Sequence, residues 1–205
     1  MLDARVGAKL RFILSPRAIH GLDLKKKSFF FLSGMIVSIP FVFYTKTMFN
    51  RLILTMPTLY ARLISTAIFT PFMEELAKAY PLMYRQGDTE RSIFLQGSIV
   101  GFGFGVAEAL IYVFMLGAPM AIRLPGILFH TLTTPITAYG IARNRALPPY
   151  LLAVTLHFLN NLSAIYDLLW LTTGYPILII TFTIDWYLNE NSSNSKTHIL
   201  HRSGI

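Results

Sequence analysis

The chain has 205 residues, of which 54% are hydrophobic and 14% are charged. A soluble domain with this apolar fraction would have too little polar surface to cover its core. The net charge of +8 could suit nucleic acid, but the basic residues stand beside apolar segments, where anchoring at a membrane surface accounts for them. Cysteine is absent, which excludes a disulfide framework, a thiolate nucleophile and cysteine-bound zinc. We therefore expect an integral membrane protein in the lipid bilayer, with no nucleic-acid partner.

Apolar segments long enough to cross a bilayer recur along the chain, and they predict an all-α polytopic membrane protein with about six transmembrane helices. Residues 1–27 are basic and are expected to form an N-terminal interfacial segment with a helix. Residues 28–188 form the predicted transmembrane helical domain. Residues 189–205 are rich in Ser and Asn and are expected to be a disordered cytoplasmic tail. In chain order, the expected spans are 28–45, 63–84, 92–116, 121–142, 148–169 and 175–188.

The distribution of Lys and Arg near the span ends predicts the orientation of the chain. Six spans place the N-terminus, the 85–91 loop, the 143–147 loop and the tail on one side, and this side carries most of the basic residues. Both termini are therefore expected in the cytoplasm, and a prokaryotic cytoplasmic membrane is the expected location. The segment 52–61 contains Pro57 and is too short to span, so we expect it to lie in the interface. Pro40 predicts a kink in the first span.

The least expected stretch is Phe72–Lys78, which places two adjacent glutamates and a lysine in an otherwise apolar span. Each charge in hydrocarbon costs about 2.5–3.5 kcal/mol on insertion scales. A purely structural helix would gain by replacing these residues with leucine, so Glu74 and Glu75 indicate a functional site. Lys78 lies three residues after Glu75 and four after Glu74, within reach of either carboxylate.

Further polar residues stand inside other predicted spans, namely Glu108, His130, His157 and Asn161. At a rise of about 1.5 Å per residue, Glu75, Glu108, His130 and His157 lie about 15–25 Å from the predicted cytoplasmic boundary. Four different helices thus carry carboxylate or imidazole groups at overlapping depths. The sequence therefore predicts that these groups converge on one site.

The third predicted span carries three glycines at four-residue spacing, Gly97, Gly101 and Gly105, and Glu108 follows three residues later. Small residues at this spacing let a neighbouring helix backbone approach closely. We expect a packing seam, and this seam would bring Glu108 against a partner helix.

Carboxylates, imidazoles and an amide can serve hydrolysis in two ways. Glutamate and histidine can hold zinc or another divalent metal, which activates a water molecule. Without a metal, a glutamate would take a proton from water while histidine and asparagine stabilise the oxyanion. Both mechanisms predict hydrolysis of an amide or ester within the membrane.

Two other classes of membrane protein account for the same residues. An ion- or proton-coupled transporter would use intramembrane glutamate and histidine as a relay. A non-catalytic scaffold or immunity protein would keep the polar core without turnover.

Four motifs in the chain together resemble those of the PrsW-type intramembrane proteases. These motifs are Glu74-Glu75-x-x-Lys78, Phe104-x-x-x-Glu108, the histidine at 130, and His157-x-x-x-Asn161, with Arg123-Leu-Pro-Gly ahead of the histidine. The PrsW-type proteases belong to the larger superfamily of CAAX prenyl endopeptidases and bacteriocin-processing and immunity proteins (CPBP). The resemblance covers roughly residues 70–165. Glu108 favours the PrsW branch, whereas Asn161 is the residue that the prenyl endopeptidases use.

The resemblance implies an intramembrane endopeptidase that hydrolyses a peptide bond of a membrane-anchored protein substrate, such as an anti-sigma factor cleaved at its outward-facing side. By motif, Glu74 and Glu75 would activate water or bind metal, and Lys78 would orient this pair. Arg123 would support the site.

The remaining motif residues would complete this centre. Glu108 and His130 would add to the water-activating or metal site, and His157 and Asn161 would hold the oxyanion. A zinc ion or another divalent metal would be held by Glu75, Glu108, His130 and His157.

Overall fold

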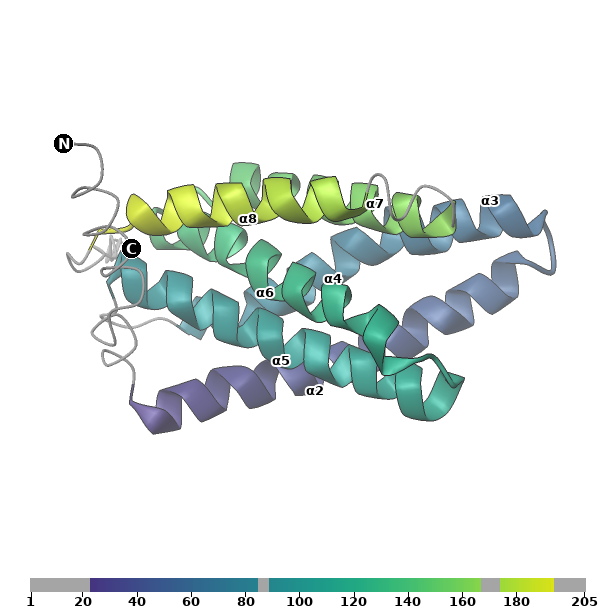
Figure 1. Cartoon of the computed structure of the whole chain (residues 1–205), viewed down its shortest axis with the longest axis horizontal. Coiled ribbons are helices and arrows are strands. Elements are labelled where there is room, and N and C mark those ends of the chain that lie inside the picture. The colour runs from purple at the N-terminus through teal and green to yellow at the C-terminus, as the bar shows by residue number, and fades with distance from the viewer. Residues whose placement is uncertain (1–22, 85–88, 167–173, 194–205) are drawn as a thin grey trace, which may run out of the picture.

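The computed structural model describes residues 23–84, 89–166 and 174–193, which are helical almost throughout and contain no sheet. The elements in chain order are α2 (Leu24–Leu52), α3 (Thr58–Arg62), the π-helical turn η2 (Leu63–Phe69), α4 (Thr70–Ala79), the 3₁₀ turn η3 (Tyr80–Tyr84), α5 (Glu90–Leu116), α6 (Met120–Ala142), α7 (Leu147–Ile165) and α8 (Tyr175–Glu190). The long helices run roughly along the long axis of the molecule as one elongated bundle (Figure 1). The predicted all-α class is thus confirmed for the described part of the chain.

The first helix is longer than the predicted span. Helix α2 continues past Thr45 to Leu52, so Lys46 and Arg51 lie within the helix and are exposed on its surface. Pro40, the predicted kink, is also inside α2. The apolar pattern stops at Lys46, but an exposed lysine does not interrupt the backbone hydrogen bonds of a helix.

The segment 52–61 divides between two elements, and its expected place in the interface stays a prediction. Its first part ends α2 and forms a turn, and its second part is α3. Pro57 immediately precedes the first residue of α3, where the missing N–H of proline interrupts no hydrogen bond of the helix. Helix α3 then continues through η2 and α4 to η3, so the predicted span 63–84 is the larger part of one helical segment.

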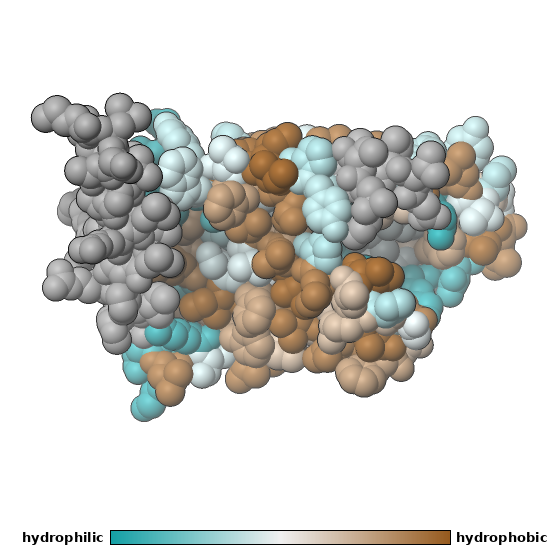
Figure 2. All heavy atoms as spheres, viewed as in Figure 1, coloured by the Kyte–Doolittle hydropathy of each residue, from teal (hydrophilic) through white to brown (hydrophobic). Residues whose placement is uncertain are grey.

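Apolar side chains cover much of the face that Figure 2 shows. Ile36, Phe114 and Leu128 are each more than half exposed. Within the described ranges, α2 and α5 are long and apolar enough to cross a membrane by length and composition. These features fit an integral membrane protein, while the count of six spans stays a prediction. Most of the predicted interfacial segment and tail lies outside the described residues.

Helix α5 packs against α6 through the predicted glycine seam. A Cβ atom at Gly101 would lie 2.1 Å from the carbonyl oxygen of His130, and one at Gly105 would lie 2.8 Å from Cα of Ile127. Gly97 meets the backbone of Pro135 in the same way. The two backbones can be this close only because side chains are absent here. The seam thereby brings the end of α5 that carries Glu108 against α6.

A second glycine contact joins α5 to α2. A Cβ atom at Gly103 would lie 2.1 Å from the carbonyl oxygen of Phe31, and one at Gly34 would lie 2.2 Å from that of Val100. Because Gly34 stands alone in its span, the sequence showed no spacing from which this contact could be predicted. Helix α5 is therefore fixed on two sides.

Replacing Gly101 with alanine should lower the unfolding temperature of the detergent-solubilised protein, because its Cβ would meet backbone that cannot move aside. Overpacking of this kind costs about 1–3 kcal/mol. Gly126→Ala is the matched control, since a Cβ there lies 3.7 Å from the nearest atom, the end of the Arg123 side chain. A Gly101→Ala variant as stable as Gly126→Ala would contradict the tight α5–α6 contact.

Candidate functional site

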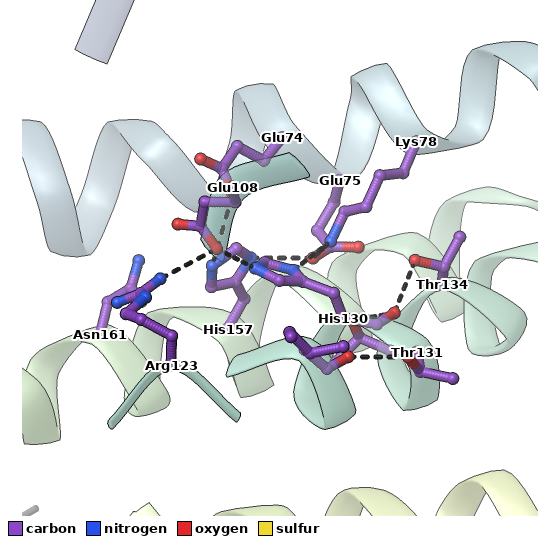
Figure 3. Close-up of polar contacts among 12 residues, drawn as sticks. Glu74, Glu75, Lys78, Glu108, Arg123, His130, Thr131, Thr134, His157 and Asn161 are labelled. Atoms are coloured by element: carbon purple, nitrogen blue, oxygen red, sulfur yellow. Dashed lines mark hydrogen bonds and ion pairs between the residues drawn. The ribbon is translucent and has the colours of Figure 1, made fainter. Parts of the chain in front are cut away.

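Polar side chains from α4, α5, α6 and α7 converge in the interior of the bundle (Figure 3). Five of them are at most 3% exposed, namely Glu74, Glu75, Lys78, His130 and His157. Glu108 is more open, with 12% of its side chain exposed. The structure thus brings together the groups for which the sequence predicted a shared depth in the membrane.

Lys78 connects two of these groups. Its Nζ donates to Glu75 Oε1 at 2.5 Å and to His130 Nδ1 at 3.0 Å. An ammonium group has only donors, so Nδ1 of His130 must accept. The neutral ring then carries its proton on Nε2, which donates to Glu108 Oε2 at 2.9 Å. Lys78 therefore determines both the orientation and the tautomer of His130.

His157 is oriented by the same glutamate. Its Nδ1 donates to Glu75 Oε1 at 2.8 Å, and its Nε2 lies 3.8 Å from Glu74 Oε2. A neutral ring that donates through Nδ1 has a free lone pair on Nε2, directed to the side of Glu74. A histidine held by a carboxylate through its other nitrogen is the usual arrangement of a metal ligand.

The charges of the cluster pair unevenly. Lys78 pairs with Glu75, and Arg123 Nη2 lies 3.1 Å from Glu108 Oε2 while its guanidinium stacks on Tyr112 at 4.0 Å. Glu74 is 3% exposed, and within the described structure its Oε2 has no hydrogen-bond partner. A buried and uncompensated carboxylate is strongly unfavourable. Glu74 therefore requires either a proton or a bound cation.

Glu74, His130 and His157 together fit a divalent metal. Each offers one ligand atom, and these atoms lie within 4.8 Å of one another. One carboxylate oxygen and two imidazole nitrogens are a common donor set for zinc. A metal at this place would supply the positive charge that Glu74 lacks.

This donor group differs from the ligand set predicted from the sequence. Glu75 was expected as a ligand; its Oε1 accepts hydrogen bonds from Lys78 and His157, while its Oε2 is buried without a hydrogen-bond partner among the described residues. Glu108 was also expected, and its Oε2 contacts His130 and Arg123. The metal-ligand roles of Glu75 and Glu108 stay predictions. Adjacent glutamates point in different directions from a helix, and the sequence alone could not show which nitrogen of His157 each of them would face.

Asn161 is engaged with the protein backbone. Its Nδ2 donates to the carbonyl oxygen of Thr66 in η2 at 2.9 Å. On the same face of α7, Tyr150 donates to the carbonyl oxygen of Phe72 at 2.9 Å. These two hydrogen bonds, one before and one after His157 along α7, thus join α7 to the segment η2–α4. The predicted oxyanion role of Asn161 stays a prediction.

Three residues near the cluster had no place in the sequence prediction. Tyr112 supports Arg123, and it stands four residues after Glu108, on the same helix face, so its spacing could have indicated a role. Tyr150 stands seven residues before His157, which also places it on a shared face. Thr66 acts through its carbonyl oxygen, for which no sequence signal exists.

Residues 25–186 match a family described as the PrsW family intramembrane metalloproteases. This range contains every residue of the cluster and the helices that carry them. No curated protein and no solved structure matches the chain.

Replacing Lys78 with methionine should strongly destabilise the protein, because Glu75 would be left as an uncompensated buried charge. Removing one partner of a buried pair costs about 3–5 kcal/mol. In the double variant Glu75→Gln/Lys78→Met the unpaired charge is absent, so the unfolding temperature should recover in part. Thermal unfolding in detergent measures both. A double variant as unstable as the sum of the two single variants would contradict a direct pair.

Proposed function

Because the chain belongs to the PrsW family of intramembrane metalloproteases, we propose that the cluster around Glu74 hydrolyses a peptide bond of a membrane-anchored protein substrate. The observation that supports this most directly is the buried, uncompensated Glu74 carboxylate beside two histidines. Structural packing alone gives no reason for that carboxylate. A divalent metal gives one, and it is also what a metalloprotease needs.

Glu74, His130 and His157 would hold zinc or another divalent metal. When bound, such a metal supplies Lewis-acid activation of a water molecule and of the peptide carbonyl. Glu75 and Lys78 serve this site indirectly. Glu75 holds the Nδ1 side of His157, which leaves Nε2 of this ring for the metal. Lys78 holds the Nδ1 side of His130, so His130 would bind through Nε2 after this atom gives up the proton that it donates to Glu108.

Glu108 is the carboxylate placed to move protons. It is the most open of the three glutamates, and Arg123 holds it from one side. In the proposed reaction its carboxylate takes a proton from the attacking water. It then returns this proton to the leaving amine when the peptide C–N bond breaks. Arg123 pairs with Glu108 and holds it in position for the first of these steps.

Substrate would reach the cluster from the side of Arg123. This residue is 22% exposed and lies in the first turns of α6, close to the α5–α6 connection. In the orientation predicted from Lys and Arg, that connection faces outward and both termini lie in the cytoplasm. The proposed cleavage is therefore on the outward-facing side of a membrane anchor, as expected for an anti-sigma factor in a prokaryotic cytoplasmic membrane.

Purified protein should contain about one equivalent of zinc or another divalent metal, and a Glu74→Gln variant should lose it, because the amide supplies no negative charge. Elemental analysis measures this, with circular dichroism to show that the helices remain. Glu190→Gln, at an exposed glutamate of α8, is the matched control and should keep the metal. Cleavage of a membrane-anchored substrate by metal-free protein would exclude the metal-dependent mechanism.

Replacing Glu108 with glutamine should lower kcat by at least about 100-fold, because proton transfer from water is lost. The metal content should not change, since Glu108 lies outside the group of Glu74, His130 and His157. The measurement is cleavage of a reconstituted substrate in liposomes. A Glu108→Gln variant that cleaves at the parent rate would show that another group is the base.

A further inference from the structure

The helical segment that carries the glutamates contains the π-helical turn η2, immediately before α4. Here the backbone N–H of Thr70 donates to the carbonyl oxygen of Ser65, five residues earlier. The hydroxyl of Thr70 donates to the same oxygen at 2.7 Å. A π-helix is defined by such five-residue bonds, and single π turns are frequent at functional sites. In this register the next bond would join residue 71 to the carbonyl oxygen of Thr66.

That next bond cannot form, because residue 71 is proline and has no N–H group. The carbonyl of Thr66 would therefore lack its donor. The side chain of Asn161, on helix α7, supplies one instead, with Nδ2 at 2.9 Å from Thr66 O. A proline ring also clashes with the carbonyl four residues earlier in a regular α-helix. Pro71 thus disfavours the α-helical register, and Asn161 completes the π-helical one.

The π turn determines which face of α4 points into the bundle. It holds about one residue more than the same length of α-helix would, and one residue corresponds to about 100° of rotation. In the structure Phe72, Leu76 and Tyr80 are exposed, whereas Glu74 and Glu75 are buried. Without the π turn, and with α3 in place, each residue of α4 would move to the angular position of its successor. The two glutamates would then no longer face His157 as they do now.

We propose that Asn161 is a positioning residue that keeps η2 π-helical through the Thr66 carbonyl and thereby sets the rotational position of Glu74 and Glu75. This role differs from the oxyanion contact predicted from the motif. It rests on the proposed function only in that Glu74 is taken as a metal ligand, because the geometry of the turn is the same whether or not the protein cleaves peptides. His157 lies one turn earlier on the same face of α7, so one helix face fixes both the turn and the Glu75 carboxylate.

The absence of cysteine from the chain allows a direct test with single spin labels. Labels at Leu76→Cys and Ala79→Cys report the exposure of α4 to oxygen dissolved in the bilayer. In the parent, position 76 is accessible and position 79 is shielded. Asn161→Ala should lower the accessibility at 76 and raise it at 79. Asn160→Ala, at the neighbouring residue, should leave both as in the parent. An unchanged pattern in Asn161→Ala would overturn the proposal.

A double-mutant cycle with Pro71→Ala tests the same link by stability. Alanine restores a backbone N–H at position 71 that can donate to Thr66 O. Asn161→Ala should therefore lower the unfolding temperature less than half as much in the Pro71→Ala background as in the parent. Equal losses in the two backgrounds would show that Asn161 does not replace the donor that proline lacks. Neither measurement uses peptidase activity, so a failed protease assay would count against the proposed function and not against this role of Asn161.

Discussion

Three carboxylates and two cations share the interior of this bundle, and the need to compensate each charge governs how the four helices around them are arranged. Lys78 and Arg123 each neutralise one glutamate, which leaves Glu74 with a buried oxygen and no partner among the described residues. In an apolar interior such a carboxylate is too unfavourable to persist without compensation. A proton on Glu74 or a bound cation would compensate it, and the group of Glu74 with two histidines fits a divalent cation.

Close backbone contacts between the helices bring these charged groups within hydrogen-bond distance of one another. The glycines of α5 let α6 approach until Glu108 and His130 are within hydrogen-bond distance. On helix α7, His157 donates a hydrogen bond to Glu75. Asn161 and Tyr150 of the same helix donate to backbone carbonyls of the segment that carries the glutamates. The side chains that bind the neighbouring backbone and those that belong to the polar cluster thus lie on the same helix faces. A substitution at a packing contact should therefore also displace the residues of the cluster.

Much of the fold could be predicted because a membrane restricts how long an apolar helix must be and where charged residues can stand along it. The positions of α5, α6 and α8 agree with the predicted spans to within about two residues, the usual uncertainty of helix ends. The extension of α2 past Lys46 and the joining of α3 to η2 were not predicted. Both depend on a helix continuing past an exposed charge, Lys46 in the first case and Arg62 in the second, and the apolar pattern does not show whether it does.

The site could be predicted as a set of residues but not as a set of bonds. The cost of buried charge identified Glu74, Glu75, Glu108, His130 and His157, and the structure brings all five together. Glu75 bonds Lys78 and His157 while Oε2 of Glu74 has no hydrogen-bond partner, and this difference depends on the rotation of about 100° between adjacent residues of a helix. The rotational position of α4 as a whole depends on the π-helical turn before it, which residue types alone do not indicate. The contact of Asn161 with the Thr66 carbonyl could not be predicted either, because it depends on the same π-helical turn.

The central claim is that Glu74 and two histidines hold a divalent metal. X-ray absorption at the zinc K-edge of zinc-loaded protein in lipid nanodiscs tests this most directly. The account predicts a first shell of nitrogen and oxygen with the outer-shell scattering of two imidazoles. It further predicts that His157→Ala removes the signal of one imidazole or abolishes binding. A zinc site without imidazole scattering, or a well-folded parent protein that binds no divalent metal, would contradict the account.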